Sequence, residues 1–351
     1  MPRSVPKLVF QAAPILMLAG AGVMALQGPE RWGRPKIERD RGRGARSPLR
    51  IPWKGWKDIL VRTRKEFVED NIPLIAAGVA FFSLLALFPG LGAFVALYGL
   101  FANVQDAQHH LAVLSVVLPG EAVKFIGQQM IRLAESQKGG LSLAFGLGLV
   151  TSIWSANGAV KALMTGLNVA YEEEEKRGFC RKTLVSLSFT IAMLVFGPAA
   201  IGVLGAGPAV EAFAGRHAAM LLNLISWPIL LVMMGLGLAL LYRYGPSRDP
   251  PRFEWISWGS AAAVLLWLLV SALFSLYVGA FAHYDKTYGS LGAVVGFMMW
   301  SWLSSLIVLL GAELNSEVEH QTAVDTTEGF PMPMGLRRAK MADTLGAAQA
   351  K

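Results

Sequence analysis

Polar side chains inside long apolar segments are the residues of this chain that could do chemistry. Asn157, Lys161 and Asn168 are separated by four and seven residues, a spacing that places them on one face of a helix. Polar groups are costly at membrane depth, and those found there commonly line the path of an ion or a substrate. The stripe therefore predicts a polar path. Lys161 also lies near the end of its segment, where its amine could instead reach the lipid phosphates, and both interpretations stay open.

A second polar group follows the last apolar segment. Glu313 and Glu317 lie four residues apart, on one helical face, with Asn315 between them. Paired carboxylates can relay protons or bind cations, and they can equally pair with basic residues of neighbouring loops, such as Arg177 or Arg181. The complete candidate polar path comprises Asn71, Pro89, Asn157, Lys161, Asn168, Glu313, Asn315 and Glu317.

A third motif precedes the last apolar segment, on the opposite side of the membrane, and consists of Tyr284, Asp285, Tyr288 and Gly289. Its tyrosines can anchor at head-group depth, and its glycine permits a tight entry into the next helix. The five histidines show no metal-ligand spacing, and the one cysteine, Cys180, cannot form an internal disulfide. The sequence therefore predicts no catalytic centre, no metal site and no cofactor.

The elements that position these residues follow from composition. The 351 residues are 54% apolar and only 16% charged, against about 25% charged in soluble domains. This excludes a soluble globular enzyme, a disordered protein and a coiled coil. Backbone polar groups in lipid must be bonded internally, which predicts an all-α, polytopic membrane helix bundle. Six segments reach the roughly 20 residues that a transmembrane helix needs and form its six core helices: 72–101, 141–164, 183–206, 218–241, 255–282 and 290–312.

Two further features concern how helices meet the membrane. Residues 72–101 are long for one span and contain Pro89, which indicates either a broken helix lining a cavity or a tilted, kinked one. Interfacial amphipathic helices are predicted before this segment and in the outer loop at 121–137. The first has Trp53, Trp56, Leu60, Arg64 and Phe67 at helical spacing, although it could also be a plain lead-in to the span.

The chain divides into three predicted regions. Residues 1–52 form an N-terminal extension, with a flexible basic linker at 28–52 and an apolar stretch at 8–26. That stretch could be an extra span, a cleaved signal peptide or the result of an early start codon, and the sequence does not decide among them. Residues 53–320 form the six-helix membrane domain, and residues 321–351 form a cytoplasmic tail that is predicted to be disordered.

Lysine and arginine counts predict the orientation. Segments 27–71, 172–182 and 243–254 hold thirteen, four and three of them, whereas the alternate loops hold only five. Positive charge stays in the cytoplasm, so both flanks of the six-helix core, including the C-terminus, are predicted to be cytoplasmic. The net charge of +8 is therefore a topology signal and a contact for anionic lipid head groups, and no nucleic-acid partner is expected.

Several of these motifs resemble one known family. They are Asp70-Asn71-Ile72-Pro73, the stretch from Ala76 to Phe82, Trp154 with Asn168 and Tyr171, the stretch from Tyr288 to Ala293, and Gly311-Ala312-Glu313-Leu314-Asn315. In this order they look like the YihY/BrkB family of bacterial inner-membrane proteins, over about residues 55 to 320. The resemblance implies six transmembrane helices in the bacterial cytoplasmic membrane.

The family carries two old labels, a tRNA-processing ribonuclease BN and a serum-resistance virulence factor, and no agreed activity. Hydrolysis of RNA needs a metal cluster or an acid–base pair beside a basic groove, a pattern that this sequence lacks. We expect a non-enzymatic protein that transports or handles lipid or envelope components along a polar path. The alternative is a non-catalytic scaffold for envelope-assembly partners. Membrane lipids are the expected partners, with a homo-oligomer or envelope-assembly proteins as further candidates.

Overall fold

The computed structural model describes residues 38–99, 127, 143–280 and 292–349. The apolar stretch 8–26 and the motif of Tyr284, Asp285, Tyr288 and Gly289 lie outside these residues, as does the predicted helix at 121–137 apart from residue 127. Contacts divide the chain into two units, Met1–Arg39 and Asp40–Lys351. The second unit contains all the long helices described below.

Helices make up the regular structure of the described residues, and the only β-type pairing there is an isolated bridge between Pro251 and Thr327. An all-α fold is therefore confirmed for this part of the chain. The helices are α2 (Trp53–Glu69), α3 (Ile72–Gly99), α6 (Leu143–Ala170), α7 (Phe179–Gly205), α8 (Gly207–Ala214), α9 (Arg216–Tyr244), α10 (Phe253–Ala280), α12 (Gly292–His320) and the short α13 (Lys340–Asp343). Two 3₁₀ turns, Arg39–Arg41 and Pro48–Arg50, precede them.

Each of the six predicted apolar segments coincides with one long helix: α3, α6, α7, α9, α10 or α12. Among the described residues, four helices are long and apolar enough to cross a membrane: Phe179–Leu204, Arg216–Tyr244, Phe253–Val278 and Val294–His320. The bent pair of α2 and the first part of α3 would add a fifth if it were one span. The chain is a membrane protein with several spanning helices, and the count of six stays a prediction.

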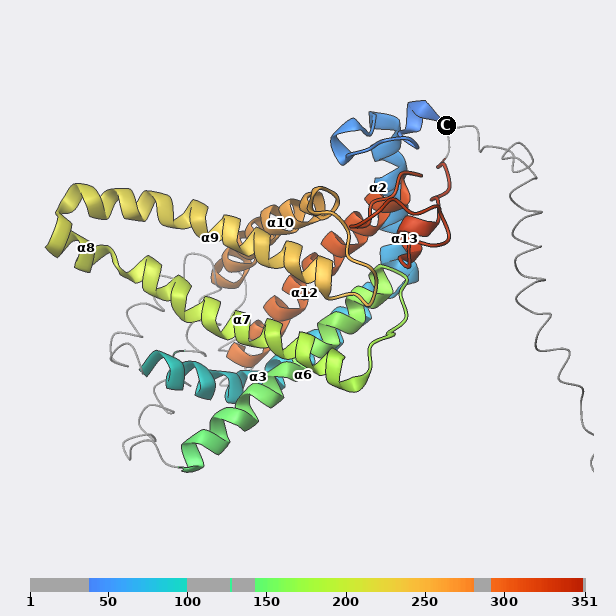
Figure 1. The fold of residues 1–351 in the computed structure, drawn as a ribbon. Helices are drawn as coiled ribbons and strands as arrows, with labels where there is room; N and C mark the ends of the chain where they lie inside the picture. The colour runs from blue at the N-terminus through green and yellow to red at the C-terminus, as the bar shows by residue number, and fades with distance from the viewer. Residues whose placement is uncertain (1–37, 100–126, 128–142, 281–291, 350–351) are drawn as a thin grey trace, which may run out of the picture. The chain divides into compact units, whose positions relative to one another are not determined.

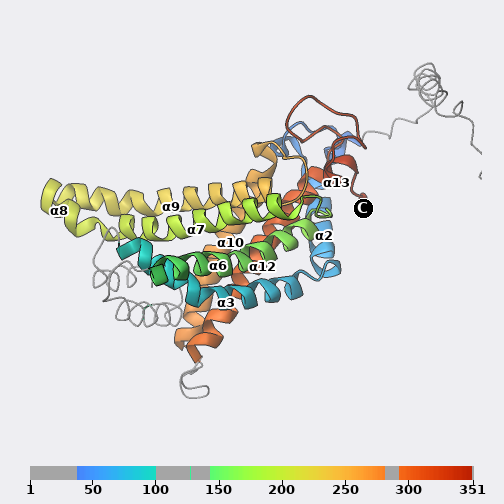
Figure 2. The same cartoon turned by 60° about the horizontal axis from the view of Figure 1, so that its bottom comes forward.

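A sharp break in the chain separates α2 from α3 rather than dividing α3 at Pro89. The two helices meet at 62°, and α3 runs through Pro89 without interruption (Figure 2). Asn71 causes the break because its φ of 53° is left-handed and cannot continue α2. Its carbonyl then accepts from the amides of Leu74 and Ile75, which starts α3. Proline removes one amide donor and its ring crowds the carbonyl of the preceding turn, which can bend a helix without ending it. The continuous α3 therefore agrees with the tilted, kinked alternative and not with a helix broken at Pro89.

Three close helix contacts build the core of the bundle. α3 packs mainly against α6, and α12 packs against both α10 and α3. Gly259 and Gly311 let α10 and α12 approach, since a Cβ at Gly259 would lie 2.1 Å from the Gly311 carbonyl oxygen. Leucine, isoleucine and methionine side chains on α7, α9 and α10 are turned outward, as a lipid-facing surface requires.

The polar segments gather at one end of the bundle, which we call the charged end (Figure 1). It comprises residues 40–52, α2, the connections 171–178 and 245–252, and the tail 321–349. The structure here differs from the expected flexible linker and disordered tail. Ala323 N bonds to the Arg43 carbonyl at 2.9 Å, and Thr326 and Met341 are fully buried. Hydrogen bonds between these polar segments order them, a source of stability that apolar periodicity does not reveal.

Candidate functional site: the charged end of the bundle

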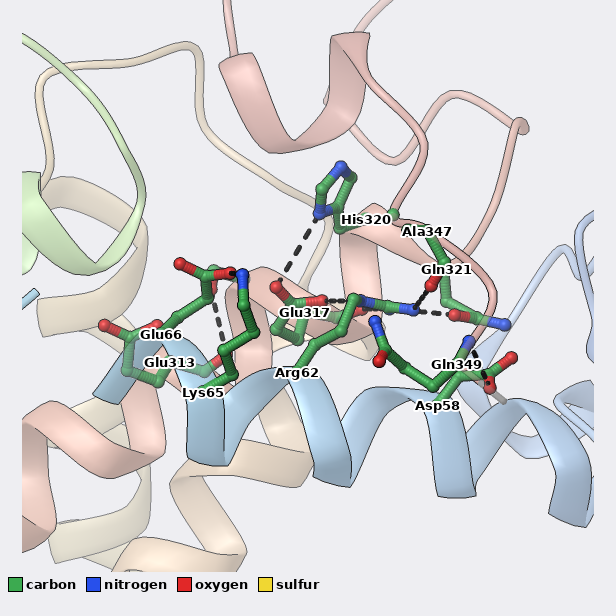
Figure 3. Close-up of polar contacts among 12 residues, drawn as sticks. Asp58, Arg62, Lys65, Glu66, Glu313, Glu317, His320, Gln321, Ala347 and Gln349 are labelled. Carbon is green, nitrogen blue, oxygen red and sulfur yellow. Dashed lines mark hydrogen bonds and ion pairs between the residues drawn. The ribbon is translucent and has the colours of Figure 1, made fainter. Parts of the chain in front are cut away.

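A ladder of polar contacts joins α2 to α12 (Figure 3). The Arg62 guanidinium donates through Nε to the Glu317 carboxylate, and both side chains are buried. Its Nη2 donates to Gln321 Oε1 at 2.8 Å and its Nη1 to the Ala347 carbonyl at 3.0 Å. Helical spacing places Asp58 and Arg62 on the same face of α2, toward α12 and the tail. Glu317 is therefore in an ion pair with a basic residue, and that residue is Arg62.

Neither of the arginines that the sequence suggested is the partner of Glu317. Arg177 instead holds Glu175 through Nε at 2.7 Å and donates to the Tyr244 and Gly245 carbonyls. Burial alone would raise the pKa of Glu175, but the hydrogen bonds from Arg177 and its charge lower the pKa to about 2. The Glu175 carboxylate is therefore charged at neutral pH, and through Arg177 it connects residues 171–178 to the end of α9.

Asp58 connects α2 to both flanking segments. It is buried, accepts from Arg41 Nη1 at 2.7 Å and accepts from the backbone amide of Gln349 at 3.0 Å. The N-terminal segment and the end of the tail therefore meet on α2. Trp53 and Leu60, two residues of the face of α2 that was predicted to lie in the membrane interface, point away from Asp58 and are 75% and 50% exposed.

Glu313 differs from Glu317 and Glu319 of the same helix because its carboxylate has no ion-pair partner among the described residues. It is 1% exposed, and its Oε1 has no hydrogen-bond partner there. The nearby charges are also acidic: Glu66 on α2, Asp70 at the α2–α3 break and Glu172 after α6. Burial and these carboxylates raise the pKa of Asp70 to about 6. Glu313 and Asp70 therefore form an acidic pair beside the break, separate from the bonded pair of Glu317 and Arg62.

Asn157 and Lys161 diverge, although one helical stripe carries both. Asn157 is buried, its Oδ1 accepts from Thr190 on α7 at 3.2 Å, and its Nδ2 has no partner in the described part of the chain. Lys161 Nζ lies over the rings of Trp154 and Phe179, 5.3 and 5.4 Å from their centroids. Those rings are 56% and 72% exposed, so this contact faces the bundle's surroundings. The geometry favours an amine held at the membrane interface over one inside a path.

The remaining amides of the candidate path join elements together. Asn168 accepts from Ser247 N at 2.8 Å and donates to Glu175, which ties the 171–178 and 245–252 connections. Asn315 accepts from Gly259 N at 2.8 Å, across the close contact of α10 and α12. Asn71 is exposed and donates to the Glu69 carbonyl. The structure thus brings Glu313, Asn315 and Glu317 together at the charged end, with Asn71 at the break, while Asn157 and Pro89 lie elsewhere along their helices.

Three arginine pairs at the charged end were missed by the sequence reasoning. Arg248 makes a bidentate pair with Glu319, at 2.6 and 3.0 Å, and both side chains are fully buried. Arg243 pairs with Glu328, and Arg337 lies 3.8 Å from Asp325. Glu319 follows Glu317 by two residues, but nothing in the local pattern identifies a partner some 70 residues away. Among the described residues, no group of His, Cys, Asp or Glu is arranged to hold a metal ion.

Residues 63–332 of the chain match the protein family described as Virulence factor BrkB. The chain belongs to this family. The matched residues begin in the middle of α2, directly after Arg62, and end in the tail. They include Glu317 and Gln321 of α12, to which Arg62 is bonded, and the buried pair of Arg248 and Glu319. The resemblance inferred from the motifs is therefore confirmed.

Curated relatives of this BrkB-family chain carry two kinds of name. The ribonuclease-like protein YfkH of Bacillus subtilis (strain 168) is 32% identical over 253 residues, 69% of this chain and 88% of that protein. The UPF0761 membrane protein IL2447 of Idiomarina loihiensis is 26% identical over 263 residues, 73% of this chain and 88% of that protein. A UPF0761 membrane protein of Neisseria meningitidis serogroup B, NMB0524, is 26% identical over 272 residues, 76% of this chain and 64% of that protein. No solved structure matches the chain.

Proposed function

We propose that this BrkB-family protein is a transporter-like protein of the bacterial cytoplasmic membrane that moves an anionic amphiphile, such as a lipid or envelope component, along the α6–α12 side of the bundle. The observation that carries the proposal is the Glu313 carboxylate, which is buried at the charged end beside Asp70 and whose Oε1 has no hydrogen-bond partner among the described residues. A buried polar atom without a partner costs about 1–3 kcal/mol. Such a cost is commonly retained where the group has a function.

Other unpartnered polar atoms lie near Glu313. Asn315 Nδ2 and the Tyr171 hydroxyl lie beside each other, and neither has another hydrogen-bond partner in the described part of the chain. Together with Asp70 they form a polar seam between the start of α3, the end of α6 and α12. A seam with unused donors and acceptors suits a passing head group or a proton better than it suits a purely structural core.

The orientation supports an anionic substrate. The positive-inside rule assigns the charged end and the C-terminus to the cytoplasm. Lys57, Arg64 and Arg181 are exposed there, where each basic side chain contributes about 1 kcal/mol of attraction to an anionic leaflet. Anionic head groups would therefore be concentrated in the leaflet around the charged end.

The ribonuclease label of the relative YfkH does not suit the charged end of this chain. Hydrolysis of RNA needs a metal cluster or a positioned acid–base pair, and among the described residues no group of His, Cys, Asp or Glu is arranged to hold a metal ion. We therefore assign the protein a non-catalytic role.

The test is a lipid-flux measurement on the full chain in proteoliposomes. A fluorescent phosphatidylglycerol is placed in both leaflets, and dithionite bleaching reports the rate at which inner-leaflet lipid reaches the outside. We expect faster exchange than in protein-free liposomes, and Glu313→Gln should slow it by about tenfold, equivalent to about 1.4 kcal/mol. Glu211→Gln, an exposed change on α8, is the matched control. Equal rates for Glu313→Gln and Glu211→Gln would sink the assigned seam.

The scaffold alternative has one observation in its favour, the well-bonded surface that residues 40–52 and 321–349 build at the charged end. A scaffold needs a stable surface and no seam. Wild-type protein that gives no lipid exchange, yet retains an envelope-assembly partner on purification in a manner that depends on this surface, would favour the scaffold.

A further inference from the structure

The tail contains a short apolar segment whose side chains face outward. Residues 329–336, which we call the apolar tail loop, read Gly-Phe-Pro-Met-Pro-Met-Gly-Leu. Phe330 is 93% exposed and Leu336 is 59% exposed, and Met332 and Met334 are also exposed. Four large apolar side chains on eight residues form a concentrated apolar patch on the surface of the tail. The loop therefore needs an apolar environment that the chain itself does not supply.

The loop is a built structure, held from its inner side. The buried Asp325 carboxylate accepts the Met332 amide at 2.7 Å, and Arg337 Nε donates to the Met332 carbonyl at 3.0 Å. Asp343 accepts the amides of Gly335 and Arg337 at 2.7 and 3.0 Å. These bonds fix the backbone and leave the apolar side chains on the other side. Pro331 and Pro333 restrict φ, which further reduces the freedom of the loop.

The base of the loop is attached where two spanning helices end. Glu328 N donates to the Pro250 carbonyl at 3.0 Å, and the Glu328 carboxylate pairs with Arg243, near the end of α9. In Figure 2 the dark red tail arches beside the connection from α9 to α10. Phe330 follows Glu328 by two residues, which span about 7 Å at most. The Phe330 Cα is therefore held within about 7 Å of the Cα of Glu328, which is bonded to Arg243 near the end of α9.

The helix ends at this boundary are themselves aromatic and outward-facing. Tyr244 closes α9 and is 46% exposed, and Phe253 opens α10 and is 44% exposed. Aromatic side chains at span ends lie at head-group depth. Arg338, next to the loop, is also exposed and can contact a phosphate. The apolar tail loop thus adds further exposed apolar side chains next to the aromatic residues at these helix ends.

We propose that the apolar tail loop inserts into the leaflet at the charged end and anchors the tail to the bilayer. Phe330 and the methionines occupy the boundary between head groups and acyl chains, and Arg338 contacts the phosphates above them. Burying apolar surface at about 25 cal/mol per Å² favours this position over water. The lipid-facing helix ends beside the loop identify the occupant as the same bilayer. A protein partner or a second copy of the chain would have to displace lipid from that place.

The test is depth-dependent quenching of a probe on the loop. In a Cys180→Ser background, Phe330→Cys and Met332→Cys are each labelled with an NBD fluorophore, and the full chain is placed in nanodiscs of phosphatidylcholine and phosphatidylglycerol. Ala348→Cys, an exposed tail position bonded near Asp58 through its neighbour Gln349, is the matched control. Quenching by lipid with a doxyl group high on the acyl chain is compared with quenching by aqueous iodide.

Insertion predicts doxyl quenching at 330 and 332 that is at least about threefold stronger than at 348, with the reverse order for iodide, because the probes lie below the phosphates. Doxyl quenching at 330 and 332 no stronger than at 348 would overturn the proposal, whether the loop is then in water or against protein. Two labelled positions keep the result independent of the folding of either variant. Lipid flux is not measured here, so the outcome is separate from that of the proposed transport.

Discussion

The buried pair of Arg248 and Glu319 gives the sharpest test of how the charged end is held together. Both side chains are fully buried, and two charge-assisted hydrogen bonds of 2.6 and 3.0 Å join them. Thr326 donates a further bond to Glu319 at 3.0 Å, and the Arg248 guanidinium lies 4.1 Å from the Tyr171 ring centroid. The pair thus connects the α9–α10 connection, α12, the tail and the end of α6.

Arg248→Met should lower the free energy of unfolding by about 3–5 kcal/mol, because it leaves the Glu319 charge buried with only the Thr326 bond. Two charge-assisted bonds at about 1.5–3 kcal/mol each, together with the ring contact, give a similar total. Glu319→Leu should cost a comparable amount by leaving the Arg248 charge unpaired. The double variant has no buried charge and should lie within about 2 kcal/mol of the wild type.

The assay is unfolding in mixed micelles of increasing SDS fraction, followed by tryptophan fluorescence. Trp255 is fully buried at the charged end and contributes to that signal. Arg181→Met, at an exposed arginine, is the control and should change the free energy by less than about 0.5 kcal/mol. Single-variant losses below about 1 kcal/mol each would refute the reasoning, as would a double-variant loss equal to their sum.

Three further predictions address other parts of the structure. Gly259→Ala should cost about 1–3 kcal/mol, since its Cβ would lie 2.1 Å from the Gly311 carbonyl, whereas Gly237→Ala, with no atom within 4 Å, should be neutral or slightly stabilising in the same SDS titration. Glu175 has a folded pKa of about 2 against 4.5, so its stabilisation is complete above pH 4.5 and is lost as pH falls toward 2; melting curves from pH 6 to pH 3 should therefore fall more steeply for the wild type than for Glu175→Gln. Deleting residues 321–351 removes two acceptors of Arg62 and should make α2 sensitive to limited proteolysis, whereas Gln321→Ala should have a smaller effect.

The positions of the long helices could be predicted from the sequence, because spans need apolar length and that length is visible. The ends of these helices were predicted less accurately than their positions. The last segment was expected to end at residue 312, but α12 continues to His320. Hydropathy falls where the bilayer ends, whereas the helix continues until Gln321 and Thr322 bond to residues 41–45. Glu313, Asn315 and Glu317 are therefore helical side chains in a packed end.

The charged end was largely hidden from the sequence because its contacts are long-range and polar. The partner of Glu317 was sought in a neighbouring loop and is Arg62, 255 residues away in sequence. The sequence left Pro89 as either a break or a kink in one helix, whereas the sharp break of the described chain lies at Asn71, where a left-handed backbone angle ends α2. The tail was predicted to be disordered, yet it is well hydrogen-bonded. The single side chain of Arg337 donates to the carbonyls of Ala323, Met332 and Ala342.

The structure also changes the meaning of the excess of basic residues. The positive-inside rule counts lysines and arginines whether or not they are paired, so the predicted orientation is unaffected. Attraction to an anionic leaflet depends instead on charge that is not neutralised nearby. Arg62 and Arg248 are buried against carboxylates and contribute to folding, not to lipid contact. We therefore expect lipid contact at the charged end to come from exposed residues such as Arg64 and Arg338 and, as proposed above, from the apolar tail loop. Removing a buried arginine should destabilise the bundle, whereas removing an exposed one should weaken lipid contact alone.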